Sequence, residues 1–305
     1  MGLTTMIQAQ NFHWLDLVDP TVAELEEVAK KYGLHPTSVQ DCLDPEHLPK
    51  FERIDTLTFI ILRAFDHSCD PHADTVQELT RKVAIFYTPA FLITVHRSDQ
   101  VFFEALREKW KTKIQSLPYP APHLVSDLIY SIFHSYEKPI DNDLDLLEKM
   151  EMKVFGTQGA KSFEVEEAYY LKRRASVFKR MLKLSADLLP KISSLFEGNN
   201  PLFQDIRDSM DSLFFFVDEL MENTNSLLYL HLSLASHRLN DVIRVLTIIS
   251  VFILPLNLIT GIYGMNFEWM PELKMAWGYP IALFSMAGIV AGLFFWFRKK
   301  GWLKS

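Results

Sequence analysis

The chain contains VLTIISVFILPLNLITGIY at residues 245–263 and YPIALFSMAGIVAGLFFWF at residues 279–297, and these two stretches decide its fold. Each is 19 residues long and carries no charged side chain. A helix of about 20 apolar residues crosses the hydrocarbon core of a bilayer, whereas a buried helix of a soluble protein seldom goes so far without a charge. We therefore predict two transmembrane helices, joined by a short loop over residues 263–278.

Charges beside the two spans predict how they are oriented. Arg238 and Arg244 precede the first span, and a basic tail over residues 298–305 follows the second. The loop between the spans instead carries Glu268, Glu272 and a single lysine. Because basic residues stay on the cytoplasmic side, both termini are expected in the cytoplasm and the loop in the periplasm. This pattern predicts a multi-pass protein of the cell inner membrane.

Charge is divided unevenly along the 305 residues. The chain has 31 Lys and Arg against 38 Asp and Glu, a net charge of −7. Residues 238–305 hold 7 basic and 3 acidic residues, a net charge of +4, so residues 1–237 carry −11. An acidic body lacks the basic surface that phosphate contacts require, which argues against a nucleic-acid-binding protein.

The sequence offers no enzyme motif. Its two cysteines, Cys42 and Cys69, match neither a zinc spacing nor a disulfide framework. There is no phosphate-binding loop of the form GxxxxGK followed by Ser or Thr, and no nucleophile stands at a recognisable spacing from a base. We therefore expect neither catalysis nor an organic cofactor.

Residues 1–120 have the pattern of a cytosolic α/β domain. A helix is expected over residues 21–32, ending before Gly33. Short runs rich in β-branched and aromatic residues, bounded by turn residues, are predicted strands. Thr88 and Pro89 predict a hairpin between the last two of them. The predicted strands cover residues 56–64, 82–87 and 90–96.

Residues 121–200 are expected to form a cytosolic helical hairpin. Helical patterns cover residues 124–155 and 162–189, and Pro190 is expected to close the second. Many of the charged residues, Asp143 among them, are assigned to the solvated faces of these helices. Electrostatic control of ions is the second interpretation of the same charges.

A long helix is predicted to follow. Residues 202–254 contain neither Gly nor Pro, and these 53 residues would make a helix about 80 Å long, against the roughly 30 Å that a bilayer needs. Residues 201–262 are therefore expected to form a cytosolic stalk that continues into the first transmembrane helix. Because long helices need partner helices, and only one such segment exists in the chain, we expect its partners to come from other copies.

One face of the first span carries polar or small residues at alternating steps of three and four. Such a stripe is typical either of an interface between helices or of a water-filled path, and the spacing alone does not separate the two. A path would need several copies in a ring, with Leu254 as a hydrophobic constriction and Pro255 as a local bend. Because the stripe holds no carboxylate, it suits an ion that keeps its water shell, as Mg²⁺ does. The stripe comprises Asn240, Ile243, Thr247, Ser250, Leu254, Asn257 and Gly261.

At the outer end of the first span, residues 263–266 read YGMN and residues 270–273 read MPEL. This sequence resembles the signature of the CorA family of magnesium transport proteins. The resemblance implies an α+β membrane protein with an N-terminal cytosolic α/β domain, a helical stalk and two C-terminal transmembrane helices. It also implies a funnel-shaped homopentamer whose first membrane helices line the pore.

The resemblance further implies roles for individual residues. Gly264, Met265 and Asn266 would form the outer selectivity filter, and Glu268 and Glu272 would attract cations to its mouth. Of the stripe residues, Asn240 would stand at the cytosolic mouth, Leu254 at the constriction, and Asn257 where relatives often have Thr.

A regulatory divalent site between protomers is implied as well. Its carboxylates would be Asp41, which follows the GLHP sequence at residues 33–36, and Asp205 at the start of the stalk. Gln40 replaces an acidic residue found in some relatives.

The function expected from these features is Mg²⁺ influx driven by the membrane potential, with Co²⁺ and Ni²⁺ as further ions and with feedback inhibition by cytosolic Mg²⁺. The membrane potential supplies about 4.6 kcal/mol per divalent ion at 100 mV. The expected partners are other copies of the chain, the lipid bilayer and divalent cations. The alternatives are a transporter of zinc or another transition metal, and a membrane-anchored scaffold.

Overall fold

The computed structural model describes residues 3–9, 11–98, 100–155, 164–196, 201–266 and 268–302. The chain divides into two compact units, Met1–Leu230 and His231–Ser305. One helix, α9 (Pro201–Tyr263), begins in the first unit and ends in the second.

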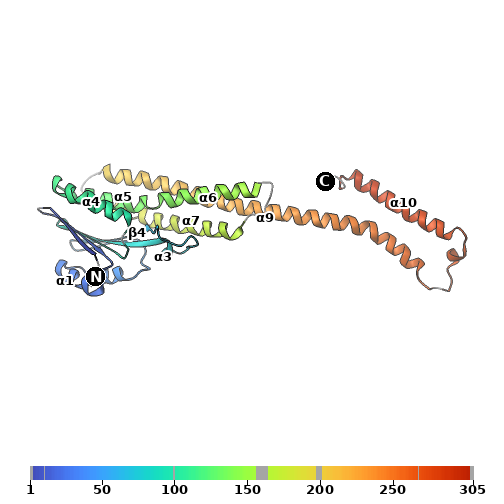
Figure 1. The fold of residues 1–305 in the computed structure, drawn as a ribbon, viewed down its shortest axis with the longest axis horizontal. Helices are drawn as coiled ribbons and strands as arrows, with labels where there is room; N and C mark the ends of the chain where they lie inside the picture. Colours follow the sequence, from blue (N-terminus) through green and yellow to red (C-terminus); the bar gives the residue numbers. More distant parts are fainter. Residues whose placement is uncertain are drawn as a thin grey trace. The chain divides into compact units, whose positions relative to one another are not determined.

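A six-stranded sheet with the strand order β1-β2-β6-β5-β4-β3 forms the centre of the first unit (Figure 1). β2 and β6 are parallel, and the other neighbouring pairs are antiparallel. The predicted hairpin is confirmed at the β5–β6 turn, where the N–H of Thr88 donates to the carbonyl of Phe91 at 2.9 Å. The strands are β1 (Leu3–Gln8), β2 (His13–Val18), β3 (Lys50–Ile54), β4 (Leu57–Phe65), β5 (Thr80–Tyr87) and β6 (Phe91–His96).

Both faces of the sheet are covered, which is why β4 is buried along its whole length. Ile60 and Leu62 belong to the apolar core on one face, and Phe59 and Ile61 to the core on the other. This alternation follows from the two-residue period of a strand.

Helices are divided between the two faces. α1 and α2 supply residues to the core that contains Phe59, whereas α4 to α8 and the first part of α9 supply residues to the core that contains Ile60. Figure 1 shows α1 below the sheet and α4, α5 and α9 above it. The helices of the first unit that precede α9 are α1 (Val22–Tyr32), α2 (Pro36–Leu43), α3 (Val76–Leu79), α4 (Val101–Ser116), α5 (Pro120–His134), α6 (Glu137–Phe155), α7 (Val165–Ala186) and α8 (Leu189–Ser193).

The residues around α1 and α2 explain how these helices start and stop. The side chain of Thr21 caps α1 and forms a capping box with Glu24. Gly33 ends α1 with φ at +67°, a left-handed conformation that glycine adopts without strain. His35 then caps α2, and Pro36 occupies its first turn. The helix predicted over residues 21–32 is therefore confirmed, with Thr21 as its cap.

The single helix predicted over residues 124–155 is wrong, because the structure has α5 and α6 in its place. Ser135 and Tyr136 interrupt it. The backbone N–H of Phe65 donates to Ser135 Oγ at 2.9 Å, and Tyr136 Oη donates to the carbonyl of Arg63 at 2.8 Å. Both residues thus bind strand β4, and this attachment fixes the break between the helices.

The expected stop at Pro190 is also wrong. α7 already ends at Ala186, and Pro190 lies in the first turn of α8. A proline is tolerated there because the N–H that it lacks has no partner inside the helix at that position.

Asp143 of α6 is not on a solvated face as expected. It is 3% exposed, and its Oδ1 lies 3.1 Å from Nη2 of Arg174 on α7. A buried carboxylate needs an opposite charge to offset the loss of water, and this ion pair joins the two helices.

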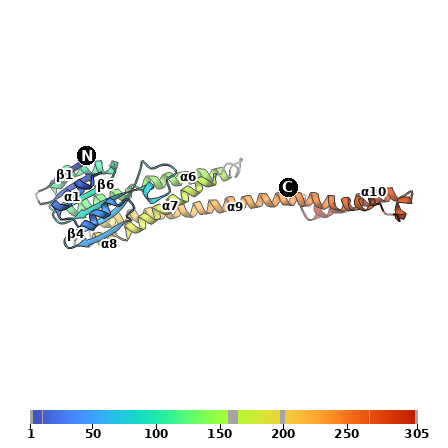
Figure 2. The same cartoon turned by 90° about the horizontal axis from the view of Figure 1, so that it is seen from below.

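The first part of α9 is packed within its own chain. Its buried residues recur every three or four positions, and α6, α7 and this part of α9 run alongside one another (Figures 1 and 2). Lys179 of α7 pairs with Asp218 of α9 at 2.7 Å. The expectation that other copies supply all the partners of the stalk is therefore wrong for this part. Its buried residues are Phe203, Ile206, Met210, Leu213, Val217, Leu220, Thr224 and Leu227.

The second unit contains the end of α9, a short 3₁₀ helix at Pro271–Lys274 and α10 (Gly278–Lys299). α9 continues through Pro255 to Tyr263 without interruption. The rings of Phe252 and Phe297 lie 5.7 Å apart and join α9 to α10.

Candidate functional site

α9 and α10 are each long and apolar enough to cross a membrane. The most apolar 18-residue window of α9 is 0% buried and that of α10 is 6% buried, so neither window lies in a protein core as a core helix of a soluble protein would. By length, composition and exposure, both fit membrane-spanning helices.

The predicted stripe lies on the face of α9 directed away from α10. Successive helix positions are about 100° apart, so the stripe from Asn240 to Gly261 falls within about 100° of the helix circumference. Phe252, which touches α10, and Leu256, which lines an apolar groove with α10 residues, fall on the opposite side. Leu254 is 65% exposed, and of the stripe only Ser250 is half-buried. The stripe is thus open to a neighbouring copy or to water.

Hydroxyl groups on α9 are oriented by the helix backbone. Thr247 Oγ1 donates to the carbonyl of Ile243 at 2.8 Å, and Ser250 Oγ donates to the carbonyl of Leu246 at 2.9 Å. Each hydroxyl uses its proton in this bond, so its oxygen remains as an acceptor. Acceptors suit the hydrogens of a cation's water shell.

The three predicted filter residues lie where α9 ends. The N–H of Gly264 donates to the carbonyl of Thr260 at 2.9 Å, and the N–H of Met265 donates to the carbonyl of Ile262 at 3.2 Å. A Cβ on Gly264 would stand 3.0 Å from the Thr260 oxygen, which favours glycine here. Asn266 follows outside the helix and is exposed.

The loop beyond Asn266 returns the chain to α10. Glu268 and Glu272 are both exposed, as expected for residues that attract cations. Gly278 is required at the turn, because a Cβ there would stand 2.2 Å from the carbonyl oxygen of Glu272. Trp269 and Trp277 are 88% and 72% exposed, in keeping with aromatic residues at a membrane surface.

Asp41, one predicted regulatory ligand, is engaged within its own chain. Its Oδ2 accepts a hydrogen bond from Lys50 Nζ at 2.7 Å, and Nε2 of His47 is 3.6 Å away. Hydrogen bonding to Asp41, together with Glu52, raises the pKa of Lys50 above its usual value although burial opposes this. A divalent ion bound to Asp41 would therefore take the place of the Lys50 ammonium.

Asp205, the other predicted ligand, is exposed in the first turns of α9. α2, which carries Asp41, and the start of α9 belong to cores on opposite faces of the sheet. Among the described residues, no group of three or more His, Cys, Asp or Glu side chains is arranged to hold a metal ion. The chain therefore does not bring its two candidate ligands together, and a site using both must draw on two copies.

A family model described as CorA-like Mg²⁺ transporter protein matches residues 9–299, nearly the whole chain. The chain belongs to this family. The cobalt/magnesium transport protein CorA of Thermotoga maritima is 28% identical over 310 residues, which cover 98% of this chain and 83% of that protein. The magnesium transport protein CorA of Escherichia coli K12 is 28% identical over 319 residues, which cover 96% and 92%.

Solved CorA structures share the fold. The complete structure of the CorA magnesium transporter from Methanocaldococcus jannaschii aligns with a TM-score of 0.70 at 23% identity, over 96% of this chain and 92% of that one. The predicted family and the predicted architecture are thus confirmed: an N-terminal α/β domain, a long helix and an apolar C-terminal helix.

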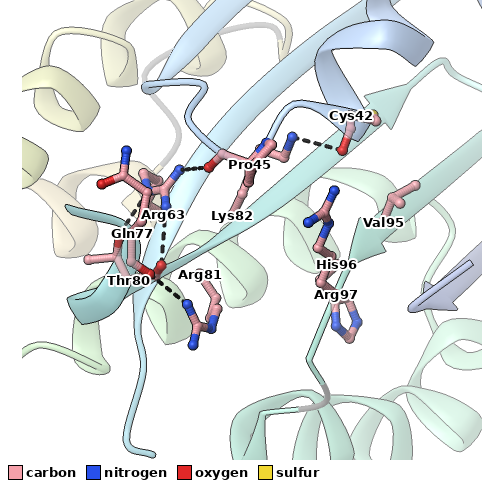
Figure 3. A pocket seen from close by; sticks show the side chains of 10 residues that line it. All are labelled: Cys42, Pro45, Arg63, Gln77, Thr80, Arg81, Lys82, Val95, His96 and Arg97. Carbon is pink, nitrogen blue, oxygen red and sulfur yellow. Dashed lines mark hydrogen bonds between the residues drawn. The ribbon is translucent and has the colours of Figure 1, made fainter. Parts of the chain in front are cut away.

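Sequence reasoning missed a basic pocket that the structure forms in the α/β domain (Figure 3). Arg63, Lys82 and Arg97 line it and come from β4, β5 and the end of β6. Lys82 follows Arg81 directly, but Arg63 and Arg97 lie far from them in the sequence, so only strand pairing brings the three strands' basic residues together. The sequence pattern that would indicate such a pocket is a basic residue on each of several adjacent strands.

Proposed function

We propose that this protein is a divalent-cation channel that admits Mg²⁺ into the cell. The observation that most supports this proposal is the polar stripe of α9, which faces away from α10 and leads to the exposed Asn266 at the end of the helix. Membership of a Mg²⁺ transporter family supports the same ion. Co²⁺ and Ni²⁺ are proposed as further substrates.

The pore is proposed to form from several copies of α9 in a symmetric ring, because one helix cannot enclose a path. We assign five copies, as the resemblance to CorA proteins implies. Asn240 then lies at the inner mouth, Leu254 at a hydrophobic constriction and Asn257 in a polar ring above it.

The filter is proposed to act on a hydrated ion. Mg²⁺ gives up its water reluctantly. A ring of Asn266 side-chain carbonyls would accept hydrogen bonds from the first-shell waters, and Gly264 and Met265 would shape the backbone around them. Glu268 and Glu272 would raise the local cation concentration outside.

Closure is proposed to depend on a divalent ion held between Asp41 of one copy and Asp205 of the next. The placement of these residues on opposite faces of the sheet supports a site between copies. High cytosolic Mg²⁺ would fill this site and hold the channel closed. The termini are proposed to lie in the cytoplasm of a cell with the channel in its inner membrane.

The membrane potential is proposed as the energy source for transport. It supplies about 4.6 kcal/mol per divalent ion at 100 mV. A zinc transporter and a scaffold anchored by a hairpin are the alternatives. No observation described above favours either alternative over the Mg²⁺ channel.

The test is ion uptake by the full-length protein in liposomes with an imposed inside-negative potential. With each ion at equal concentration on both sides, net Mg²⁺ uptake that exceeds Zn²⁺ uptake and stops without the potential is the expected result. Preference for Zn²⁺ would favour the zinc transporter. Liposomes impermeable to both ions, although they contain intact oligomers, would favour the scaffold.

A further inference from the structure

The basic pocket has a volume of about 250 Å³ and lies in the α/β domain of an otherwise acidic body. Four cationic side chains line it: Arg63, Arg81, Lys82 and Arg97. Figure 3 shows Arg63 and Arg81 at one end, Arg97 at the other and Lys82 between them.

Neutral oxygens surround these cations. Lys82 Nζ donates to the carbonyls of Asp41 and Cys42 at 2.5 and 2.7 Å and to that of Asp44. Arg97 Nη2 donates to the carbonyl of Leu43 at 2.7 Å. The two side chains thereby cap the C-terminal end of α2, but carbonyl dipoles leave their formal charges in place.

Arg63 is held in the same way. Its Nε donates to Thr80 Oγ1 at 2.7 Å, and Nη1 donates to the carbonyls of Pro45 and His47, each at 3.0 Å. The residue is 2% exposed, and burial lowers the pKa of its guanidinium from the usual value. A guanidinium so far from water is stabilised by any negative charge that approaches it.

Carboxylates compensate little of this charge. Arg81 pairs with Asp66 at 2.7 Å. Across the described parts of the chain, none of the ion pairs within 4.0 Å involves Arg63, Lys82 or Arg97. Asp44 is an exposed acid nearby whose charge raises the pKa of both Arg63 and Lys82, although burial lowers both more, and its side chain accepts a hydrogen bond from the N–H of Glu46. The pocket therefore keeps an excess of positive charge.

We infer that this pocket binds a phosphate-type anion, either inorganic phosphate or the phosphoryl group of a larger molecule. Guanidinium groups match the oxygens of phosphate in pairs of hydrogen bonds, and Lys82 adds a point charge. Arg97 is exposed and donates one hydrogen bond to the protein, so it has N–H groups to offer. The volume is below the roughly 300–1,000 Å³ of drug-sized sites, which favours a compact anion.

The test is calorimetric titration of the full-length protein in detergent with sodium phosphate, at constant ionic strength and without divalent cations. Saturable binding of one phosphate per chain is expected, with no matching signal from chloride. A parallel titration with ATP distinguishes the sources: tighter binding of ATP indicates a phosphoryl group on a larger ligand. Absence of saturable binding of either anion would overturn the inference.

Substitutions locate the site. Arg97→Gln is expected to weaken phosphate binding about tenfold or more, because a hydrogen bond to a charged group contributes about 1.5–3 kcal/mol. Arg97→Lys, which keeps the charge, should weaken it less. Arg53→Gln is the matched control, since Arg53 is exposed on β3 of the same sheet. Equal weakening by Arg97→Gln and Arg53→Gln would place the anion elsewhere and refute this site.

Discussion

The surroundings of Asp143 change the acidity of its side chain. Burial raises the pKa of its carboxyl to about 6, and the charge of Arg174 opposes part of that rise. Across the residues that the structure describes, Oδ2 has no hydrogen-bond partner, so one oxygen of the carboxylate is buried without compensation. The folded protein therefore binds a proton at Asp143 more readily than the unfolded chain does.

This difference predicts a pH dependence of stability. Between about pH 4 and pH 6 the folded state holds more protons at Asp143, so its contribution to stability grows as the pH falls through that window. Asp143→Asn removes the titrating group. From pH 7 to pH 5, we expect the free energy of unfolding of wild type to rise by about 1 kcal/mol or more relative to that of the variant. Each kcal/mol corresponds to about 2–4 °C in the thermal unfolding temperature.

Asp145→Asn is the matched control, because Asp145 is exposed on the same helix. Its difference from wild type should stay nearly constant between the two pH values. A loss of wild-type stability relative to Asp143→Asn on acidification would contradict the assignment.

Local residue patterns predicted some of this detail and missed the rest. The YGMN signature made Gly264 and Asn266 candidates for the filter because the motif is contiguous. The burial of Asp143 was not predictable, since it depends on how α6 packs against α7. The same holds for Lys50, which neutralises Asp41 from β3 and stands nine positions away in the sequence.

At the scale of elements, helices and strands followed from the sequence where the signals were local. Gly33 marks the end of α1, and the absence of Gly and Pro from residues 202–254 marks most of α9. Helix breaks that depend on distant partners could not be predicted from the sequence. Ser135 and Tyr136 separate α5 from α6 because they bind β4. β1, β2 and β3 were missed for the same reason, since their pairing with the sheet outweighs weak local patterns.

The turn into α10 yields a prediction at this scale. A Cβ at position 278 would stand 2.2 Å from the Glu272 carbonyl oxygen, so Gly278→Ala forces the loop to move. Overpacking of this kind costs about 1–3 kcal/mol. We expect a lower thermal unfolding temperature in detergent and reduced ion uptake, because the same loop follows the filter.

Gly288→Ala provides the comparison, since a Cβ at that position of α10 meets nothing within 4 Å. It is expected to unfold close to the wild-type temperature. Equal behaviour of the two variants would show that the approach at Gly278 does not constrain the loop.

At the scale of the whole molecule, the single chain leaves open the two surfaces that the proposed channel would use. The polar face of α9 has no partner helix on it in the described single chain, and Asp41 and Asp205 lie on opposite sides of the sheet. Hydropathy predicted the two spans, and the YGMN and MPEL motifs predicted the family. The copy number rests on the resemblance alone, because periodicity shows that a face needs a partner without showing how many copies supply it.

The proposed site between copies predicts a change in protection by Mg²⁺. Asp205→Ala removes one carboxylate from it, so about tenfold more Mg²⁺ should be needed to slow limited proteolysis of the oligomer. Asp141→Ala, on an exposed position of α6, is the control and should behave as wild type. An unchanged Mg²⁺ requirement in Asp205→Ala would remove Asp205 from the sensor.

In the proposed channel, Mg²⁺ passes Asn266 on its way through a ring of α9 helices. The most direct test is the rate of Mg²⁺ influx into liposomes at a fixed inside-negative potential, compared between Asn266→Ala and Asn142→Ala, a control at an exposed position of α6. We predict that Asn266→Ala loses influx while its oligomer stays intact, and that Asn142→Ala keeps the wild-type rate. Wild-type influx through Asn266→Ala would contradict the account.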